Sequence, residues 1–316
     1  MANSTSFHPN FFLLMGIPGL ENSHLLLSIL FCFMYILGVA ANSILIAVIS
    51  VHESLHQPMY FFLVMLAVGD LVLSSTTVPK TLCIFWFGSH EISFNSCLVQ
   101  IFFIHFICMT ESAILLAMAY DRYIAICYPL SYVTKLNLSF VMTVILVSVT
   151  RSLIIITPLV LLAWRLPYQD SNIIEHTYCE HMAMARLATA SILINVIYGM
   201  VIMVLTSVID LFLIGLSYVS IIQAIMRLST SEARRKTSST CVSHLCVITL
   251  LYVPAFFSFI AHRIPHNNVP PYVHILVANI YVIVPPMLNP IIYGVRTKEI
   301  QQKAIKMFTG KFIDYH

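Results

Sequence analysis

A few polar and ionisable side chains interrupt long apolar stretches of this sequence, and they are the first candidates for chemistry. Asp70 and Glu111 each lie near the middle of such a stretch, with Asn42 and Asn289 at comparable depth. Two carboxylates in a small polar site could bind a cation or share a proton. They could equally belong to a hydrogen-bond network that only joins helices, at roughly 0.6 kcal/mol per bond. The two interpretations are compatible, and both stay open.

Two further sets of charges call for different interpretations. Arg151 and Asp210 each interrupt another apolar stretch, and we expect either one to bond to a neighbouring helix rather than to a ligand. Asp121 and Arg122 stand together at the end of a third stretch, inside MAYDRYIAICYPL at Met118–Leu130. An ion pair there could merely mark the membrane boundary, or it could have two arrangements and act as a switch.

An enzyme site is not predicted from these residues. His105 and Glu111 are six positions apart on one predicted helix, which places them on different faces. A nucleophile with a nearby base is missing from the pattern, and the cysteines and histidines lack metal-site spacing. We therefore expect no catalytic site, no cofactor and no metal site of cysteine and histidine.

The composition identifies the class of protein that must position these groups. Of 316 residues, 59% are apolar and 9% are charged, against about 25% charged in soluble domains. A net charge of +3 gives no reason to expect a nucleic-acid partner. Seven stretches reach the roughly 20 apolar residues that cross a bilayer as a helix. They are Leu25–Val51, Tyr60–Val78, Cys97–Tyr120, Leu138–Trp164, Leu187–Met226, Thr237–Ile260 and Tyr272–Val295. The predicted fold is an all-α membrane protein, a seven-transmembrane helix bundle.

Loop charges predict the orientation in the plasma membrane. With the amino terminus outside, the basic residues of the inner segments are Arg122, Lys135, Arg227, Arg234, Arg235, Lys236, Arg296, Lys298, Lys303, Lys306 and Lys311. Those of the outer segments are Lys80, Arg165, Arg186 and Arg263. We divide the chain into an extracellular amino terminus at 1–24, a seven-transmembrane domain at 25–295 and a cytoplasmic tail at 296–316. Asn3 begins an outer glycosylation sequon, and no cleaved signal peptide is expected.

The eight cysteines divide into two groups on this topology. Cys97 and Cys179 face the oxidising side, so a disulfide between them is predicted. The other six are expected to be apolar packing residues or reduced thiols. They are Cys32, Cys83, Cys108, Cys127, Cys241 and Cys246.

Five motifs, in this order along the chain, resemble those of rhodopsin-like G protein-coupled receptors and, within them, of olfactory receptors. They are LHQPMY at Leu55–Tyr60, MAYDRYIAIC at Met118–Cys127, SY at Ser217–Tyr218, RKTSSTCVSH at Arg235–His244 and PMLNPIIY at Pro286–Tyr293. Together they cover nearly the whole chain. The resemblance implies a receptor for a small odorant, in the membrane of olfactory neuron cilia.

Two stretches resemble the class I, or fish-like, branch of that family: Phe11–Leu20 and the HTYCEH run at His176–His181. In that branch the outer loop usually carries two further cysteines, where this chain has Gln169 and Thr189. We expect one bridge to be absent and the loop to be looser, held mainly by the predicted disulfide.

The resemblance also implies the roles of residues at the inner end. Asp121 and Arg122 would hold the inner helix ends together while paired, and a released Arg122 would turn toward Tyr218 and a stimulatory, adenylyl-cyclase-activating G protein. His244 could bond to Tyr218 or Arg122 during that change, or could be a satisfied interhelical histidine. Tyr293 completes this predicted switch. Pro158, Pro254 and Pro290 permit kinks in the helices that must move.

The ligand prediction places a medium-chain fatty acid in the outer third of the bundle. The carboxylate would bind Arg263 in a bidentate manner with help from His105, and the alkyl tail would point toward Tyr252. The predicted apolar wall consists of Phe102, Phe106, Cys108, Met109, Ile202, Met203, Ala255 and Phe259. Arg263 could instead reach lipid headgroups, His105 could bond to a backbone carbonyl, and part of the wall could be ordinary core. Each buried methylene would add about 0.8 kcal/mol, which would select chain length.

Other functions remain as alternatives. The same fold could sense a metabolite in another tissue, and the sequence does not separate that role from odorant detection. A small transporter is disfavoured because the halves lack matched interrupted spans. After the seventh span, Ile300, Ala304, Ile305 and Phe308 share one face, which predicts a short amphipathic helix on inner-membrane lipids.

Overall fold

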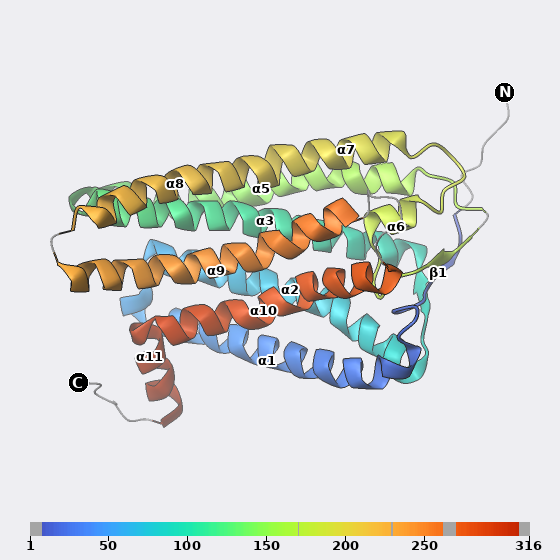
Figure 1. Ribbon diagram of the computed structural model, residues 1–316, viewed down its shortest axis with the longest axis horizontal. Coiled ribbons are helices and arrows are strands. Elements are labelled where there is room, and N and C mark those ends of the chain that lie inside the picture. Colours follow the sequence, from blue (N-terminus) through green and yellow to red (C-terminus); the bar gives the residue numbers. More distant parts are fainter. Residues whose placement is uncertain (1–7, 170, 229, 262–269, 310–316) are drawn as a thin grey trace.

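The structure is a computed structural model that describes residues 8–169, 171–228, 230–261 and 270–309 of the chain. Within these residues, seven helical segments are long and apolar enough to cross a membrane, as the sequence predicts. Figure 1 shows them running side by side along the long axis of the molecule. They are α1 His24–Val51, α2 Pro58–Phe87, α3 Phe94–Cys127, α5 Leu138–Trp164, α7 Leu193–Met203 continued by the π-helix η4 Val204–Val208 and α8 Ile209–Met226, α9 Ser231–Ala261, and α10 Pro271–Arg296.

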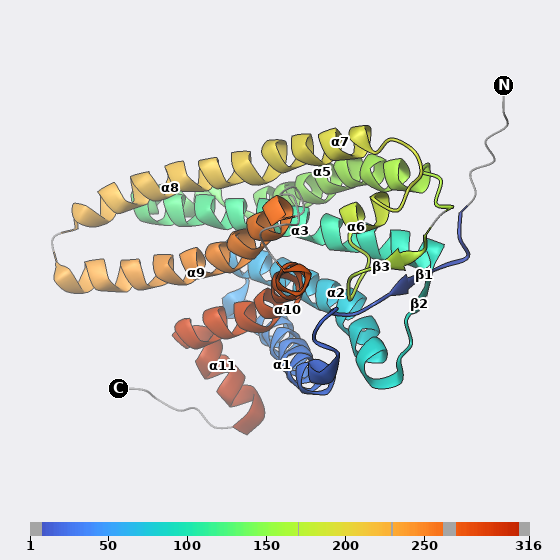
Figure 2. The ribbon, with the colours of Figure 1, turned by 45° about the vertical axis from the view of Figure 1, so that its right-hand side comes forward.

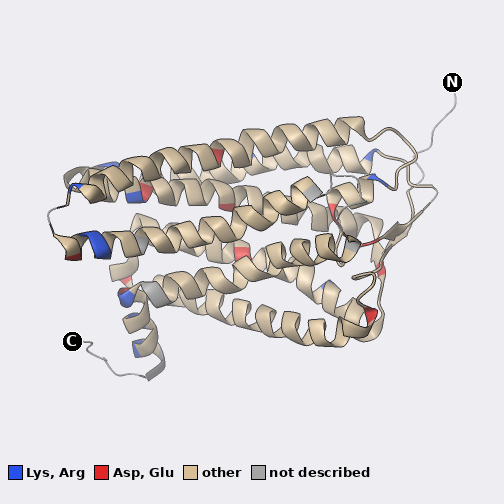
Figure 3. Cartoon of the chain, viewed as in Figure 1, with Lys and Arg blue, Asp and Glu red and all other residues tan. Residues whose placement is uncertain are grey.

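Short elements complete the fold at the two ends of the bundle. They are the 3-10 turns η1 Glu21–Ser23, η2 Glu53–Leu55 and η3 Pro129–Ser131 and the helices α4 Tyr132–Lys135, α6 His181–Ala185 and α11 Lys298–Thr309. We call the end that contains α6 the disulfide end, and the opposite end, where α3 finishes, the Arg122 end. Figure 3 shows the charged residues gathered mainly toward these two ends, with few in the middle.

Helix α3 lies at the centre of the bundle and contacts α2, α5, α8 and α9. It begins after Ser93, whose Oγ accepts a hydrogen bond from the backbone N–H of Ser96 at 3.1 Å, an ordinary N-cap. Because α3 is surrounded, its polar side chains are buried: Gln100, Thr110, Glu111, Ser112 and Asp121. This central helix therefore supplies polar groups to each of the sites described below.

Several helix boundaries differ from the sequence prediction. Helix α2 continues nine residues beyond Val78, past a lysine, because Lys80 Nζ reaches out to the carbonyls of Ser89 at 2.8 Å and Glu91 at 2.6 Å. The fifth span begins at Leu193 rather than at Leu187, since the residues between them belong to the preceding loop.

A three-stranded sheet at the disulfide end was not predicted from the sequence. Its strands are β1 Phe11–Leu14, β2 Glu91–Ser93 and β3 Ile173–Ile174, in the order β2-β1-β3. Strand β1 pairs antiparallel with β2 and parallel with β3. Figure 2 shows β1, near the amino terminus, lying between β2 and β3. The sheet thus ties the amino terminus and the loop before α6 together, in addition to the disulfide.

The loop that lacks the extra cysteine pair has other attachments. The backbone N–H of Thr189 donates to the carbonyl of Pro167 at 3.0 Å. Nearby, Tyr168 is 2% exposed and donates to the carbonyl of Ala163 at 2.8 Å. Burial raises the pKa of Tyr168, so its hydroxyl keeps the proton that this bond requires.

The carboxyl-terminal helix α11 is present, as predicted, and Figure 1 shows it turning away from the bundle axis after α10. Ile300 on it is 3% exposed, and Ala304 packs against the same core. Tyr60 of α2 donates to Glu299 at 3.1 Å and so ties α11 to the bundle. The side chain of Phe308 lies outside the described part of the structure, and the membrane-surface location of α11 stays a prediction.

Candidate functional site

A cavity of about 190 Å³ lies in the disulfide half of the bundle, between α3, α5, α7, η4, α9 and α10. One buried water needs roughly 10–15 Å³ of such space, so the cavity accommodates a small organic molecule. Eight of the predicted ligand residues line it: His105, Cys108, Met109, Ile202, Met203, Tyr252, Ala255 and Phe259. The sequence therefore located the cavity on the correct faces of α3, α9 and the fifth span.

Two predicted wall residues are wrong. Phe106 does not line the cavity, and neither does Phe102. The cavity-facing positions of α3 are His105, Cys108, Met109 and Ser112, which follow the helical spacing of one face. Phe102 and Phe106 lie one step around the helix, stacked on each other at 5.5 Å and packed toward α5 and α7. Arg263, the predicted carboxylate partner, lies outside the described residues.

The disulfide end of the cavity is closed by the segment that leads into α6. Cys97 and Cys179 form the predicted disulfide, with Cα atoms 5.4 Å apart. Gln100 holds the same place from α3: its Oε1 accepts from the N–H of Cys179 at 2.7 Å, and its Nε2 donates to the carbonyl of Thr76 at 2.7 Å. Tyr178 lines the cavity beside them. Burial raises the pKa of Tyr178 well above its ordinary value, so this hydroxyl stays neutral.

Three polar residues gather at this end. The rings of His105 and His181 lie 6.2 Å apart, edge to face. Glu180 begins α6, where its Oε2 accepts from the N–H of Ala183 at 2.6 Å. All three polar side chains line the cavity. Sequence analysis found His105 alone, because loop residues such as Glu180 and His181 carry no periodic signal.

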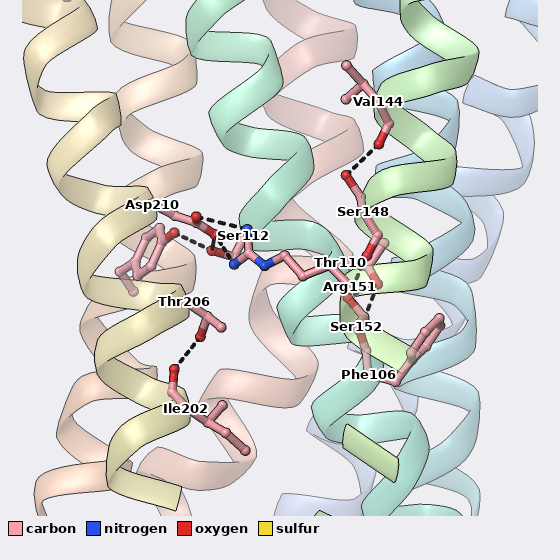
Figure 4. Close-up of polar contacts among 11 residues, drawn as sticks. Phe106, Thr110, Ser112, Val144, Ser148, Arg151, Ser152, Ile202, Thr206 and Asp210 are labelled. Carbon is pink, nitrogen blue, oxygen red and sulfur yellow. Dashed lines mark hydrogen bonds and ion pairs between the residues drawn. The ribbon is translucent and has the colours of Figure 1, made fainter. Parts of the chain in front are cut away.

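The opposite, deep end of the cavity is a hydrogen-bonded network, drawn in Figure 4. Arg151 of α5 holds Asp210 of α8 through two bonds, Nη1 to Oδ1 at 3.0 Å and Nη2 to Oδ2 at 2.7 Å. Ser112 of α3 donates to Asp210 Oδ2 at 2.7 Å and lies 2.6 Å from the hydroxyl of Tyr252 on α9. The expectation that Arg151 and Asp210 bond to neighbouring helices is confirmed, and each is the other's partner.

Below the cavity, the predicted polar centre assembles around α10. Pro290 has no N–H, so the carbonyl of Pro286 lacks its helical partner, and Asn42 Nδ2 donates to it at 2.8 Å. Asn289 Nδ2 donates to both carboxylate oxygens of Asp70, at 3.1 and 3.2 Å. The four predicted residues are therefore split between a structural bond and a carboxylate site.

Glu111 belongs to the carboxylate site but is less well bonded. It is 3% exposed, and its Oε1 has no hydrogen-bond partner within the described part of the chain. A Cβ placed on Gly69 would lie 2.9 Å from that oxygen, so the glycine makes room for the carboxylate. Among the described residues no three histidines, cysteines or acids gather as metal ligands, so Asp70 and Glu111 offer a cation two carboxylates at most.

At the Arg122 end, the predicted switch residues lie close together. Asp121 is 1% exposed and accepts a bond from the Tyr132 hydroxyl at 2.9 Å, while Arg122 Nε stands 4.0 Å from its other oxygen. Tyr218 and His244 join α8 to α9 through a 2.8 Å bond between Oη and Nδ1. Tyr293 is buried in the same apolar cluster as Tyr218.

Comparisons with known proteins agree with this architecture. The family model described as "Olfactory receptor" matches residues 31–311. Olfactory receptor 52N2 of Homo sapiens is 48% identical over 313 residues, covering 99% of this chain and 98% of the relative. Olfactory receptor 52B2 of Homo sapiens is 52% identical over 306 residues, covering 97% and 94%. The crystal structure of squid rhodopsin superimposes with a TM-score of 0.73 at 17% identity, covering 93% of this chain and 89% of that one, which shows the fold alone.

Proposed function

The chain belongs to the olfactory receptor family of G protein-coupled receptors, which are not enzymes, and from this premise we propose that it detects medium-chain carboxylic acids and signals through a stimulatory G protein. It is a multi-pass membrane protein. We place the disulfide end outside the plasma membrane of olfactory cilia and the Arg122 end in the cytoplasm. Glycosylation at Asn3, which lies outside the described residues, and membership of the class I branch belong to the same proposal.

The observation that carries the ligand proposal is the lining of the cavity, which is mostly apolar and has one group of polar residues at the disulfide end and another at the deep end. His105 and Ser112, at the two ends, are seven residues apart on α3, which is about 10 Å along a helix. An extended chain advances roughly 1.2 Å per bond. About eight bonds therefore separate the two polar ends, which corresponds to a medium-length alkyl chain.

The head group is proposed to bind at the disulfide end. The imidazoles of His105 and His181 are donors there, and Arg263 is the proposed bidentate partner. Glu180 lines the same end, and its carboxylate favours a cationic head group instead. Primary amines of equal chain length are therefore the second candidate class of ligand.

A dose–response series separates these classes. The compounds are the C6 to C10 carboxylic acids with the alcohols, methyl esters and amines of matching length, and the readout is cyclic AMP in cells that carry an olfactory-type stimulatory G protein. We expect the acids to be most potent and each added carbon to raise potency about fourfold until the cavity is full. Equal potency of acid and ester, or a normal response from Arg263→Ala, would contradict the site, and a preference for amines would transfer the head group to Glu180.

The proposed route from cavity to G protein runs along α9. A ligand that contacts Tyr252 and Phe259 touches α9 on both sides of Pro254, where a missing N–H permits the helix to bend. Ligand binding can shift α9 only if the ligand binds more tightly when α9 has moved toward it than when it has not. At the far end the movement would change the contact of His244 with Tyr218, and Arg122 would be released to bind the G protein.

The tissue in which the receptor acts does not follow from the geometry of the cavity. A receptor with this cavity could serve in the nose or sense a metabolite in another tissue, and the location of its transcript decides between these roles.

The carboxylates Asp70 and Glu111 are proposed to share a proton or hold a cation between them. Both are buried, and among the described residues the structure places no basic side chain in hydrogen-bonding contact with either. Dependence of signalling on sodium concentration, lost in Glu111→Gln, would support the cation.

A further inference from the structure

Three hydroxyl groups at the deep end of the cavity, those of Ser112, Tyr252 and Thr206, have already used their hydrogens. Ser112 donates its one hydrogen to Asp210 at 2.7 Å, because a carboxylate held by both nitrogens of Arg151 is ionised and can only accept. The 2.6 Å contact between Ser112 and Tyr252 must therefore be donated by Tyr252. The phenolic oxygen of Tyr252 is left with acceptor capacity alone.

Thr206 of the π-helix η4 is in the same condition. Its Oγ1 donates to the carbonyl of Ile202 at 2.8 Å, and the residue is 1% exposed while it lines the cavity. Ser207 beside it is a third hydroxyl, which can donate or accept. The deep end thus presents two oxygens that can only accept and one that can do either. A methyl group placed there would leave the acceptor lone pairs of these oxygens without a donor, which is unfavourable.

We infer that the preferred ligand carries a hydrogen-bond donor at its inner end, so that the ligand class is a medium-chain acid with a terminal hydroxyl group rather than a plain fatty acid. The inference rests on the proposed function for the chain length and the acid head group. The inner hydroxyl donates to Tyr252 or Thr206 and can accept from Ser207. Asp210 does not contact the ligand in this proposal. It accepts from Ser112 and so determines that Tyr252 donates to Ser112.

The experiment compares ligands of equal length that differ at the inner end. In the cyclic AMP assay, 8-hydroxyoctanoic acid is compared with nonanoic acid, and 8-methoxyoctanoic acid, which can only accept, with decanoic acid. We expect the hydroxy acid to be about 3- to 10-fold more potent than nonanoic acid and the methoxy acid to be weaker than decanoic acid. A hydroxy acid equal to or weaker than nonanoic acid would overturn the inference while leaving the acid head group intact.

We call the deep end of the cavity, lined by Ser112, Thr206, Ser207 and Tyr252, the cavity floor. Substitutions there test whether these residues cause the preference for a hydroxy acid. Tyr252→Phe and Thr206→Val each remove one acceptor, and each should reduce the ratio of the two potencies toward 1 even if the response as a whole weakens. Tyr198→Phe and Thr157→Val are matched controls, since Tyr198 bonds to the carbonyl of Ile155 and Thr157 to that of Leu153, and neither residue lines the cavity. A ratio unchanged in both floor variants would also overturn the inference.

A second pair of compounds separates this inference from the proposed function. Octane-1,8-diol and nonan-1-ol lack a carboxylate but differ in the same inner group. A diol that is more potent than nonan-1-ol, in a receptor that ignores the acids, would support the inner donor and reject the acid head group. If none of the acids or alcohols activates a receptor present at the cell surface, both the inference and the proposed function are wrong.

Discussion

Two ion pairs lie among the described residues, one next to the deep end of the cavity and one at the Arg122 end, and their geometries differ. Arg151 and Asp210, below the cavity, meet through two bonds of 2.7 and 3.0 Å. Asp121 and Arg122, at the other end, approach to 4.0 Å. Both acids are buried, at 3% and 1% side-chain exposure, so burial does not explain the difference.

The partners of each acid explain it better. Asp210 accepts a further bond from Ser112, so every neighbour of that carboxylate holds it in one arrangement. Asp121 accepts from the hydroxyl of Tyr132 through one oxygen, while Arg122 Nε stays 4.0 Å from the other oxygen, beyond hydrogen-bond distance. A carboxylate bonded by its arginine at both oxygens fixes the helices that carry the pair, whereas an arginine held only by a long contact can take a second arrangement at little cost. The first pair thus suits a rigid cavity floor, and the second suits a switch.

The largest effect is expected from breaking the tight pair. Asp210→Asn keeps the shape of the side chain but leaves Arg151 without its charge partner inside the bundle. Removing one member of a buried pair costs about 3–5 kcal/mol, so the thermal midpoint of the purified receptor should fall and surface expression should drop with it.

The matched control is Asp121→Asn at the loose pair, where the free energy of unfolding should change by less than about 1 kcal/mol. Basal cyclic AMP should rise instead, because Arg122 loses the group that restrains it. Equal destabilisation by the two substitutions would remove the distinction between scaffold and switch.

The second prediction concerns signalling without loss of fold. Arg122→Ala should abolish ligand-induced cyclic AMP while the receptor still reaches the cell surface, because the Arg122 contact with Asp121 is too long to contribute much stability. Surface labelling and cyclic AMP are measured on the same cells. A variant that keeps its response would show that Arg122 does not contact the G protein, and a variant lost from the surface would show that the pair is structural.

The helices and the cavity differ from the loops in how far the sequence predicted them. Long apolar runs fix the spans almost regardless of context, and helical periodicity placed His105, Met109 and Tyr252 on the cavity side. The sequence also predicted Phe106 on the cavity wall, although Phe106 lies one step around the helix, since adjacent faces of α3 are both apolar and a pattern of hydrophobicity does not separate them.

The sequence did not predict which residues far apart in the chain contact each other. Arg151 and Asp210 are 59 positions apart, and nothing local to either residue indicates the other. The strands of the sheet are two to four residues long, too short for an alternating pattern to be recognised. Glu180 and His181 close the cavity from the start of the five-residue helix α6, whose position depends on the disulfide and the sheet rather than on its own sequence.

The smallest expected effect sharpens the comparison most, because it removes the hydrogen-bond partner of Asp121 without changing either member of the pair. Burial and the nearby carboxylate of Asp121 raise the pKa of Tyr132, so its hydroxyl remains protonated and donates at 2.9 Å. Tyr132→Phe removes that hydrogen bond and leaves Arg122 as the donor closest to Asp121. The pair should tighten, the inactive arrangement should gain roughly 1 kcal/mol, and the half-maximal ligand concentration should rise about fivefold.

Tyr128→Phe is the matched control for this substitution, since its hydroxyl lies 3.5 Å from that of Tyr123 and outside the Asp121 contacts. It should leave the dose–response curve in place. If Tyr132→Phe instead lowers the half-maximal concentration or raises basal cyclic AMP, Tyr132 holds Asp121 in the position where it restrains Arg122. The hydroxyl of Tyr132 would then be part of the restraint on Arg122, and the long distance between Asp121 and Arg122 would not indicate a weakly restrained arginine.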